Sequence, residues 1–382
     1  MTSLFVVIFP FSNSFSLFHY YNGIMAIDGY ILGLIPFILF RKEKLFSLSF
    51  ERKIILLLII ANIFYILYAF NINNQRDQIL KDLRPLLYLL SIALFLSIAI
   101  KERVTFSLSK IKTIALYAAL SNAIWFLFSY LGVFDFNTED LYLKNNSNRY
   151  LDLSTYFSIY FIIHFQYLIS KKIITNNSFL RFVLILSFIS LLVSNSRSLI
   201  ITVLICIGLI SIKNIKQAIY FLIFSVILIS IFLIVSDLIG QDRIENSLNS
   251  EGLINQLTNR YSPAFDALNS MSFNNYIFGL GLGYYFEISW FEYRGMKTLN
   301  ASIDSSYLTH FIKQGIFGLL TIFTSIKLLC TFRLYRIRKY FVFFWLIIFL
   351  IAAPLYQNAL YGVVFYLMIV WNIQDLNFKE DS

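Results

Sequence analysis

Charged residues are scarce in this sequence. Asp, Glu, Lys and Arg make up 14% of the chain, against about a quarter of an ordinary soluble domain. Hydrophobic residues account for 58% and aromatic residues for 18%. Many apolar runs follow one another, and they are near or just below the ~20 residues needed to cross a bilayer. This composition excludes an ordinary soluble domain and predicts an all-α polytopic integral membrane protein.

Cysteine and histidine are also rare, with two and three residues in the whole chain. Cys206 and Cys330 both lie in apolar stretches without CxxC spacing, so we expect them to pack and not to form a disulfide or a metal centre. His19, His164 and His310 have no partners at metal-ligand spacing. We therefore expect no metal and no other cofactor.

The apolar segments predict about twelve transmembrane helices in a single membrane domain, residues 1–382. The first segment has neither a basic residue before it nor a convincing cleavage site, so we interpret it as a retained span. There is no internal repeat of the kind that marks inverted-repeat transporters. The expected spans lie near residues 3–19, 24–40, 53–70, 85–100, 111–131, 153–170, 179–194, 198–212, 217–236, 305–328, 340–355 and 358–372.

The basic residues determine the expected orientation. The net charge is +10, but the Lys and Arg residues are scattered over short loops and form no continuous surface for nucleic acid. With the N-terminus in the cytoplasm, the cytoplasmic segments hold 20 of the 31 basic residues, while the opposite side holds 15 of the 21 carboxylates. The positive-inside rule therefore predicts that both termini are cytoplasmic.

Three connections on the outer side are long, at residues 71–84, 132–152 and 237–303. Long loops in a compact protein are usually functional or disordered. The extracytoplasmic loop 237–303 contains aromatic residues and short helix-like patches, which favours order. We expect the functional site on this outer face.

Arginines provide the first candidates for that site. Arg197 lies in a polar notch between two short apolar runs, where a cation costs about 2.5–3.5 kcal/mol unless it meets an anion or water. The alternative is an arginine that extends to the outer headgroups. Arg260 lies in the longest outer loop, and Arg84 and Arg149 lie in the two other outer loops, so all three can face the same side.

The remaining candidates lie between the glycine run and the tenth expected span. The run from Gly279 to Gly283 lacks the preceding strand and following helix of a dinucleotide fingerprint. Its alternate glycines predict either a tight turn or, at Gly281 and Gly283, a close approach to a phosphate. Asp304 is either a catalytic base or a helix cap. Tyr307 and His310 follow in the same span as candidate substrate-binding residues.

Together these motifs resemble the superfamily of O-antigen polymerases and O-antigen ligases, multispanning enzymes that join lipid-diphosphate-linked glycans outside the inner membrane. The similarity covers about residues 190–320. The matching motifs are Ser196-Arg197-Ser198, Arg260 followed by Phe265-Asp-Ala-Leu268, Phe278-Gly-Leu-Gly-Leu-Gly283, and Ser306-Tyr-Leu308 with Gln314-Gly-Ile-Phe-Gly318.

The resemblance implies that Arg197 and Arg260 hold the diphosphate of an undecaprenyl-linked donor. It also implies a second lipid-linked glycan as acceptor and a chain-length regulator as a possible partner. The ligases have His-Asn before the Tyr-Leu pair, whereas this chain has Asp304-Ser305, which favours the polymerase branch. The site would lie on the outer face of a bacterial inner membrane.

The residues support the same chemistry by a physical argument. Negative charge grows on the leaving diphosphate during glycosyl transfer, and guanidinium groups can stabilise this charge bidentately without a metal. A nearby carboxylate or histidine can take the proton of the acceptor hydroxyl. We therefore expect a glycan polymerase with Asp304, Arg260 and Arg197 as catalytic residues. The alternatives are an O-antigen ligase that acts on lipid A core, and a polysaccharide flippase or other transporter.

Overall fold

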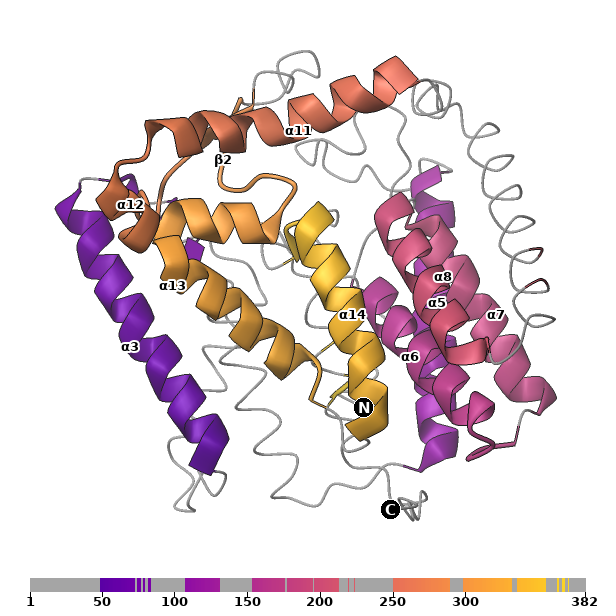
Figure 1. Cartoon of the computed structure of the whole chain (residues 1–382). Helices are drawn as coiled ribbons and strands as arrows, with labels where there is room; N and C mark the ends of the chain where they lie inside the picture. Colours follow the sequence, from indigo (N-terminus) through magenta and orange to yellow (C-terminus); the bar gives the residue numbers. More distant parts are fainter. Residues whose placement is uncertain are drawn as a thin grey trace.

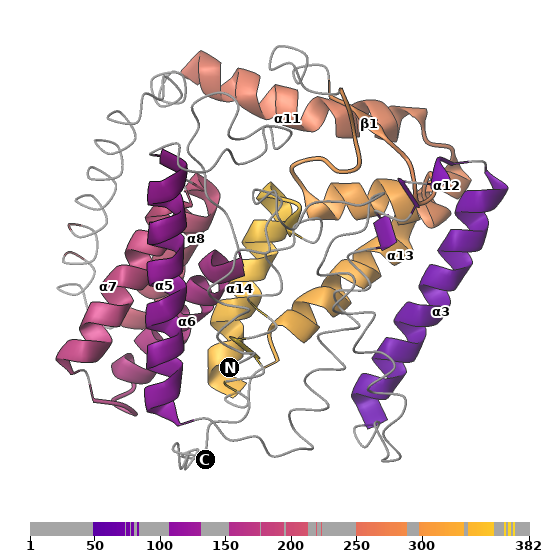
Figure 2. The same cartoon turned by 180° about the vertical axis from the view of Figure 1, so that it is seen from behind.

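The computed structural model in Figures 1 and 2 is mostly helical. It describes residues 49–72, 74–76, 78–79, 82–83, 107–130, 153–175, 177–194, 196–212, 250–288, 298–331 and 335–354, with residues 219, 223, 363, 366–367 and 370. The helices are α3 (Ser49–Asn71), α5 (Leu108–Tyr130), α6 (Leu153–Ser170), α7 (Ser178–Val193), α8 (Arg197–Ser211), α11 (Ser250–Ser270), α12 (Phe273–Phe278), α13 (Ser306–Leu329) and α14 (Tyr335–Ile351).

These helices coincide with those expected spans that fall on described residues. Helices α3, α5, α6, α7, α8, α13 and α14 each overlap one of them. By length and composition, Ser306–Leu329 is the described helix that can cross a membrane, and Ile60–Asn71, Ser178–Val193 and Ser198–Ser211 are shorter apolar helices. The helical class is thus confirmed, whereas the twelve spans are not established by the described helices. The expected spans 3–19, 24–40 and 85–100 lie outside the described residues, as do 217–236 and 358–372 apart from single positions.

Helix α6 lies at the centre of a bundle with α5, α7, α8 and α14 (Figure 2). Its residues from Ser154 to Phe165 are all buried, as expected for a helix that is apolar around its whole circumference. The ring of Tyr156 stacks on Trp345 of α14, with centroids 6.2 Å apart. The Tyr160 hydroxyl donates a hydrogen bond to the Leu329 carbonyl at 2.8 Å and so joins α6 to the end of α13.

A buried polar network joins three of these helices. Asn122 of α5 donates to Thr155 of α6 at 3.1 Å and to Ser190 of α7, and Ser154 donates to the Asn122 side-chain oxygen. Such hydrogen bonds between helices satisfy polar groups that cannot reach water. The network therefore fixes the relative positions of α5, α6 and α7.

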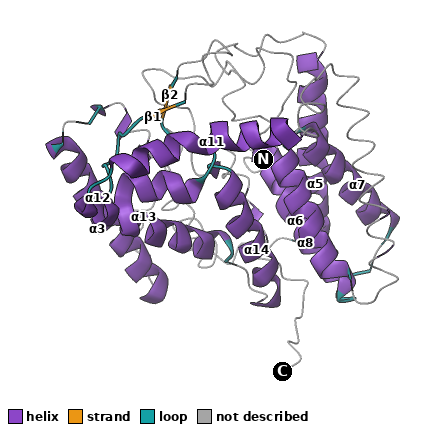
Figure 3. Cartoon of the chain, turned by 45° about the horizontal axis from the view of Figure 1, so that its top comes forward, coloured by secondary structure: helices purple, strands orange, loops and turns teal. Residues whose placement is uncertain are grey.

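Helix α11 crosses one end of the other helices (Figures 1 and 3). Ala264 and Ala267 of this helix, and Met271 just after its end, pack in a small apolar cluster with Phe286 and Ile312. Phe265, on the opposite face of the helix, is 60% exposed. One long helix thus stands where the sequence predicted only short helical patches.

The expectation of a purely helical chain needs one small correction. Phe286–Glu287 (β1) pairs antiparallel with Leu299–Asn300 (β2). These two-residue strands (Figure 3) connect the described residues 250–288 with the described residues 298–331. Such a short pairing has no periodic hydrophobic signal that a sequence analysis could detect.

Candidate functional site

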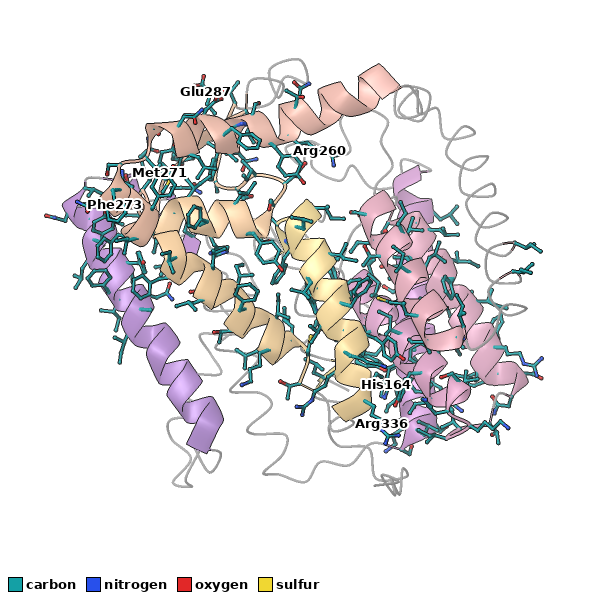
Figure 4. The ribbon with its side chains drawn as sticks, viewed as in Figure 1. His164, Arg260, Met271, Phe273, Glu287 and Arg336 are labelled. Atoms are coloured by element: carbon teal, nitrogen blue, oxygen red, sulfur yellow. The ribbon has the colours of Figure 1, made fainter. Side chains whose placement is uncertain are left out.

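The structure brings two predicted site residues together at the end that α11 crosses. The Arg260 Nε atom on α11 lies 3.4 Å from Asp304 Oδ2, just before α13. Both side chains are about half exposed, at 48% and 45%. Figure 4 shows Arg260 beside the ribbon of α11 and Arg336 at the opposite end of the molecule. A cation and a carboxylate therefore meet at a solvent-accessible position on this end.

The C-terminal end of α14 holds both residues in place through their neighbours in the chain. The Tyr261 hydroxyl donates to the Leu350 carbonyl at 3.3 Å. The Ser305 hydroxyl donates to the Phe349 carbonyl at 3.5 Å, and Ser306 donates to the Ala352 carbonyl from both its N–H and its hydroxyl at 3.0 Å. The last carbonyls of a helix lack intrahelical partners. The last carbonyls of α14 therefore accept the hydrogen bonds that hold the neighbours of Arg260 and Asp304 in place.

Tyr261 stays a hydrogen-bond donor in this setting. Burial raises the pKa of its phenol, the Asp304 carboxylate raises it further, and Arg260 lowers it. The phenol therefore remains protonated at neutral pH and can donate its hydrogen bond to the Leu350 carbonyl.

Asp304 is not the cap of α13. The N-cap is Ser305, whose hydroxyl accepts a hydrogen bond from the Leu308 N–H at 3.4 Å. The sequence left capping and catalysis open for Asp304, and this geometry removes the capping interpretation. Its carboxylate is directed to Arg260 instead.

Arg197 is the first residue of α8, and the packing of α8 on α14 indicates where that helix begins. The Cys206 thiol contacts the Tyr340 carbonyl at 3.6 Å, so the second half of α8 lies beside the first turns of α14. The nine residues from Cys206 back to the start of α8 span roughly 14 Å. The eleven residues from Tyr340 to the end of α14 span roughly 17 Å. Because α8 and α14 pack together and run in opposite directions (Figure 1), the start of α8 lies toward the end of α14 where Arg260 and Asp304 meet.

Helix α13 is broken at Gly315, which has φ 59° and ψ −146°. The three carbonyls before the break accept hydrogen bonds from other segments: Ile312 from the Leu280 N–H at 2.7 Å, Lys313 from the Gly281 N–H at 2.9 Å, and Gln314 from the Tyr65 hydroxyl at 2.7 Å. A broken helix in an apolar setting needs such external donors.

The glycine run fits against this break. A Cβ atom at Gly279 would lie 2.2 Å from the Lys313 backbone, and one at Gly315 would lie 2.2 Å from the Ile277 carbonyl oxygen. Gly279, Gly281 and Gly283 all have positive φ, a conformation that only glycine adopts without strain. The Gly281 and Gly283 N–H groups donate to protein acceptors. The geometry therefore favours a structural turn over a phosphate cradle.

A buried ion pair beside the glycine run was missed by the sequence analysis. Lys313 Nζ donates to both carboxylate oxygens of Asp82, at 2.7 and 2.6 Å, and both side chains are fully buried. Asp82 Oδ2 also accepts from the Gly283 N–H at 2.7 Å. The available signal was a lysine inside an apolar span, since such residues almost always meet a partner.

The other predicted residues are distributed as follows. The Tyr307 hydroxyl donates to the Leu346 carbonyl at 3.3 Å and so belongs to the α14 contact. His310 is buried in α13, and its Nδ1 atom lies 3.5 Å from Gln314 Oε1. Arg84 and Arg149 lie outside the described residues, as does the side chain of Arg197. Cys206 and Cys330 are buried free thiols, as expected.

Fold and site together define a helical protein with a long amphipathic helix across one end and an exposed Arg–Asp pair beneath it. The chain belongs to a family of unknown function (DUF6369), whose model matches residues 92–377. The match includes α5 to α14 and both residues of the pair. No curated protein and no solved structure matches the chain.

Proposed function

We propose that this protein is a membrane-embedded glycosyltransferase that polymerises undecaprenyl-diphosphate-linked oligosaccharide repeat units into O-antigen or a related surface polysaccharide. About twelve spans hold the site on the outer face of the bacterial inner membrane, with both termini in the cytoplasm. The observation that carries the proposal is the exposed Arg260–Asp304 pair. It lies at the same end of the molecule as the start of α8, where Arg197 stands.

The proposed reaction uses both charges of this pair. The acceptor hydroxyl oxygen forms a bond to the anomeric carbon of the donor sugar. The bond from that carbon to the diphosphate oxygen breaks, and its electron pair leaves with the lipid diphosphate. Arg260 and Arg197 stabilise the growing negative charge bidentately, and Asp304 accepts the hydroxyl proton. The guanidinium groups supply the positive charge, so no metal is needed for this step.

Two features support the position and the orientation of the protein in the membrane. The expected cytoplasmic segments are rich in Lys and Arg, and Arg336, which belongs to them, lies at the opposite end from Arg260 in Figure 4. Exposed apolar side chains also run along the outer surfaces of α3 and α13, among them Phe64, Leu67, Leu320 and Phe323. Lipid would cover these side chains.

Arginine replacement tests the proposal in cells of the source organism. We expect Arg260→Ala and Arg197→Ala to abolish surface polymer and to accumulate single repeat units on lipid, because losing one such donor costs about 3–4 kcal/mol, or 10² to 10³ in rate. Lys should rescue only partly, because an ammonium lacks the planar fork. Electrophoresis of the polymer and mass spectrometry of extracted lipids provide the measurement.

Arg336→Ala is the matched control, because Arg336 is an exposed arginine at the opposite end. It should leave the polymer unchanged. A normal polymer length distribution in Arg260→Ala, at an expression level equal to wild type, would remove Arg260 from the site.

A second candidate function is a polysaccharide flippase or another transporter. The broken helix α13 and the buried Asp82–Lys313 pair favour it, because broken helices and intramembrane charges line many transport sites. If the protein is a transporter, its deletion should leave lipid-linked repeat units on the cytoplasmic side of the membrane. If it is a polymerase, its deletion should leave them on the outer side. An O-antigen ligase would instead leave full-length polymer on its lipid carrier.

A further inference from the structure

The Arg260–Asp304 contact has the geometry of an ion pair that can open. One guanidinium nitrogen faces one carboxylate oxygen at 3.4 Å, and water reaches about half of each side chain. Exposed pairs of this kind contribute little to stability. The buried Asp82–Lys313 pair has two shorter contacts and no exposure, so its two charges stay together.

The backbone around the exposed pair is fixed while the side chains remain exposed. The next residue after Arg260 is bound to the Leu350 carbonyl, and the next residue after Asp304 is bound to the Phe349 carbonyl. The two side chains can therefore separate without any movement of α11 or α13. This arrangement allows exchange of partners at the guanidinium.

A diphosphate is a stronger partner for Arg260 than one carboxylate oxygen. Its oxygens match the planar donor fork of arginine bidentately, and it carries more negative charge than the single carboxylate of Asp304. The diphosphate and the Asp304 carboxylate would compete for the Arg260 guanidinium, because Asp304 already contacts that group. Binding of the donor and release of Asp304 are then one event.

We propose that the Arg260–Asp304 pair is a substrate-operated switch, in which the donor diphosphate takes Arg260 and thereby frees Asp304 for the acceptor. This inference rests on the proposed function. Without donor, Asp304 and Arg260 neutralise each other. With donor bound, the Asp304 oxygen that faced Arg260 accepts the proton of the acceptor hydroxyl, as the hydroxyl oxygen attacks the anomeric carbon and the lipid diphosphate leaves. The switch makes activation of the acceptor depend on the donor.

The switch and a permanent positioning role for Asp304 have opposite consequences for binding. If Asp304 competes with the diphosphate, its removal should tighten diphosphate binding. If Asp304 instead holds Arg260 in its working position, its removal should weaken that binding. Turnover falls in both cases, so the affinity distinguishes them.

The experiment measures binding of undecaprenyl diphosphate to the purified full-length protein in lipid nanodiscs, with turnover of lipid-linked repeat units measured in parallel. For Asp304→Asn we expect about two- to fivefold tighter binding, the size of an exposed ion pair, and turnover lower by about 10² to 10⁴. Asp304→Glu keeps the charge and should bind as wild type does. Arg260→Ala should bind at least about tenfold more weakly.

Asp266→Asn is the matched control, since Asp266 is an exposed carboxylate on the same helix as Arg260. It separates a general change in surface charge from relief of competition, and it should leave affinity and turnover near wild type. Equal or weaker binding by Asp304→Asn, or equal tightening by Asp266→Asn, would overturn the switch. Failure of wild-type protein to bind undecaprenyl diphosphate, with Arg260→Ala no different from it, would instead reject the proposed function.

Discussion

Ion pairs of two kinds occur among the described residues, and their surroundings assign them different roles. The Asp82–Lys313 charges are fully buried, which costs several kcal/mol per ion before their contacts are counted. Two short hydrogen bonds and the Gly283 N–H offset this cost. The Arg260–Asp304 pair is half exposed and contributes about 0–1 kcal/mol. The buried pair therefore acts on stability, and the exposed pair is available for chemistry.

Replacing one member of the buried pair should destabilise the protein strongly. We expect Lys313→Met to lower the free energy of unfolding by about 3–5 kcal/mol, because it leaves the Asp82 carboxylate buried and uncompensated. The double replacement Lys313→Met with Asp82→Leu should recover most of this loss, since neither charge then remains. Thermal denaturation of the purified protein in detergent measures both effects.

The control for this prediction is Lys327→Met, at an exposed position of the same helix. It should denature at nearly the wild-type temperature. Lys313→Met with wild-type stability would show that the pair contributes nothing, and failure of the double variant to recover would assign the loss to packing of the lysine stem.

Single residues were predictable where the signal was an isolated charge on the outer side. Arg260 and Asp304 met this condition, and they lie in contact. Asp82 and Lys313 are far apart in the sequence, so their pairing could not be read from spacing. The capping interpretation of Asp304 was wrong because the neighbouring Ser305 hydroxyl takes that role. The catalytic roles of Arg260, Asp304 and Arg197 all stay predictions.

At the scale of the elements, α13 and the glycine run from Gly279 to Gly283 meet in a tight backbone contact, which we call the seam. The break at Gly315 turns the first half of α13 away from the second, and the glycine run supplies two of the donors that its carbonyls need. The first half carries Ser305 and Ser306 at its start, which bind α14. The position of Asp304 thus depends on the break.

A side chain at Gly315 should therefore disrupt the seam. We expect Gly315→Ala to destabilise the protein by about 1–3 kcal/mol from the backbone conformation alone, with a further loss because the Cβ atom would lie 2.2 Å from the Ile277 carbonyl oxygen. The fraction of monodisperse protein in size-exclusion chromatography and the denaturation temperature provide the measurement.

Ser272→Ala is the comparison for this variant. Ser272 is exposed and precedes α12 without a side-chain capping bond, so its replacement should be neutral. If Gly315→Ala behaved like Ser272→Ala, the positive φ and the close backbone contact at Gly315 would not matter for folding.

The sequence predicted the apolar helices more accurately than the polar ones. Helices such as α6 and α7 begin and end close to the expected residues, because long apolar runs define them. The polar α11 was expected only as short patches, since its stability comes from packing on β1 and α13. The break in α13 depends on tertiary donors, which no local pattern reveals.

At the scale of the whole molecule, one group of helices packs around α6, and α11 crosses the end where the site lies (Figure 1). The sequence predicted this helical class from its low content of charged residues and from its many long apolar runs. The number of spans and the identity of the reaction go beyond the described helices and stay proposals. Membership of a family of unknown function covers most of the chain, so an established role for this protein would inform that whole family.

The central claim is that the protein joins lipid-linked glycans, and reconstitution tests it most directly. Single repeat units on undecaprenyl diphosphate, extracted from a strain of the source organism that lacks the protein, are incubated with purified wild-type protein in liposomes containing EDTA. We predict a ladder of polymers and release of undecaprenyl diphosphate, both absent with Arg260→Ala. Repeat units that remain single with well-folded wild-type protein, in EDTA and with added Mg²⁺ or Mn²⁺ alike, would contradict the proposed polymerase function.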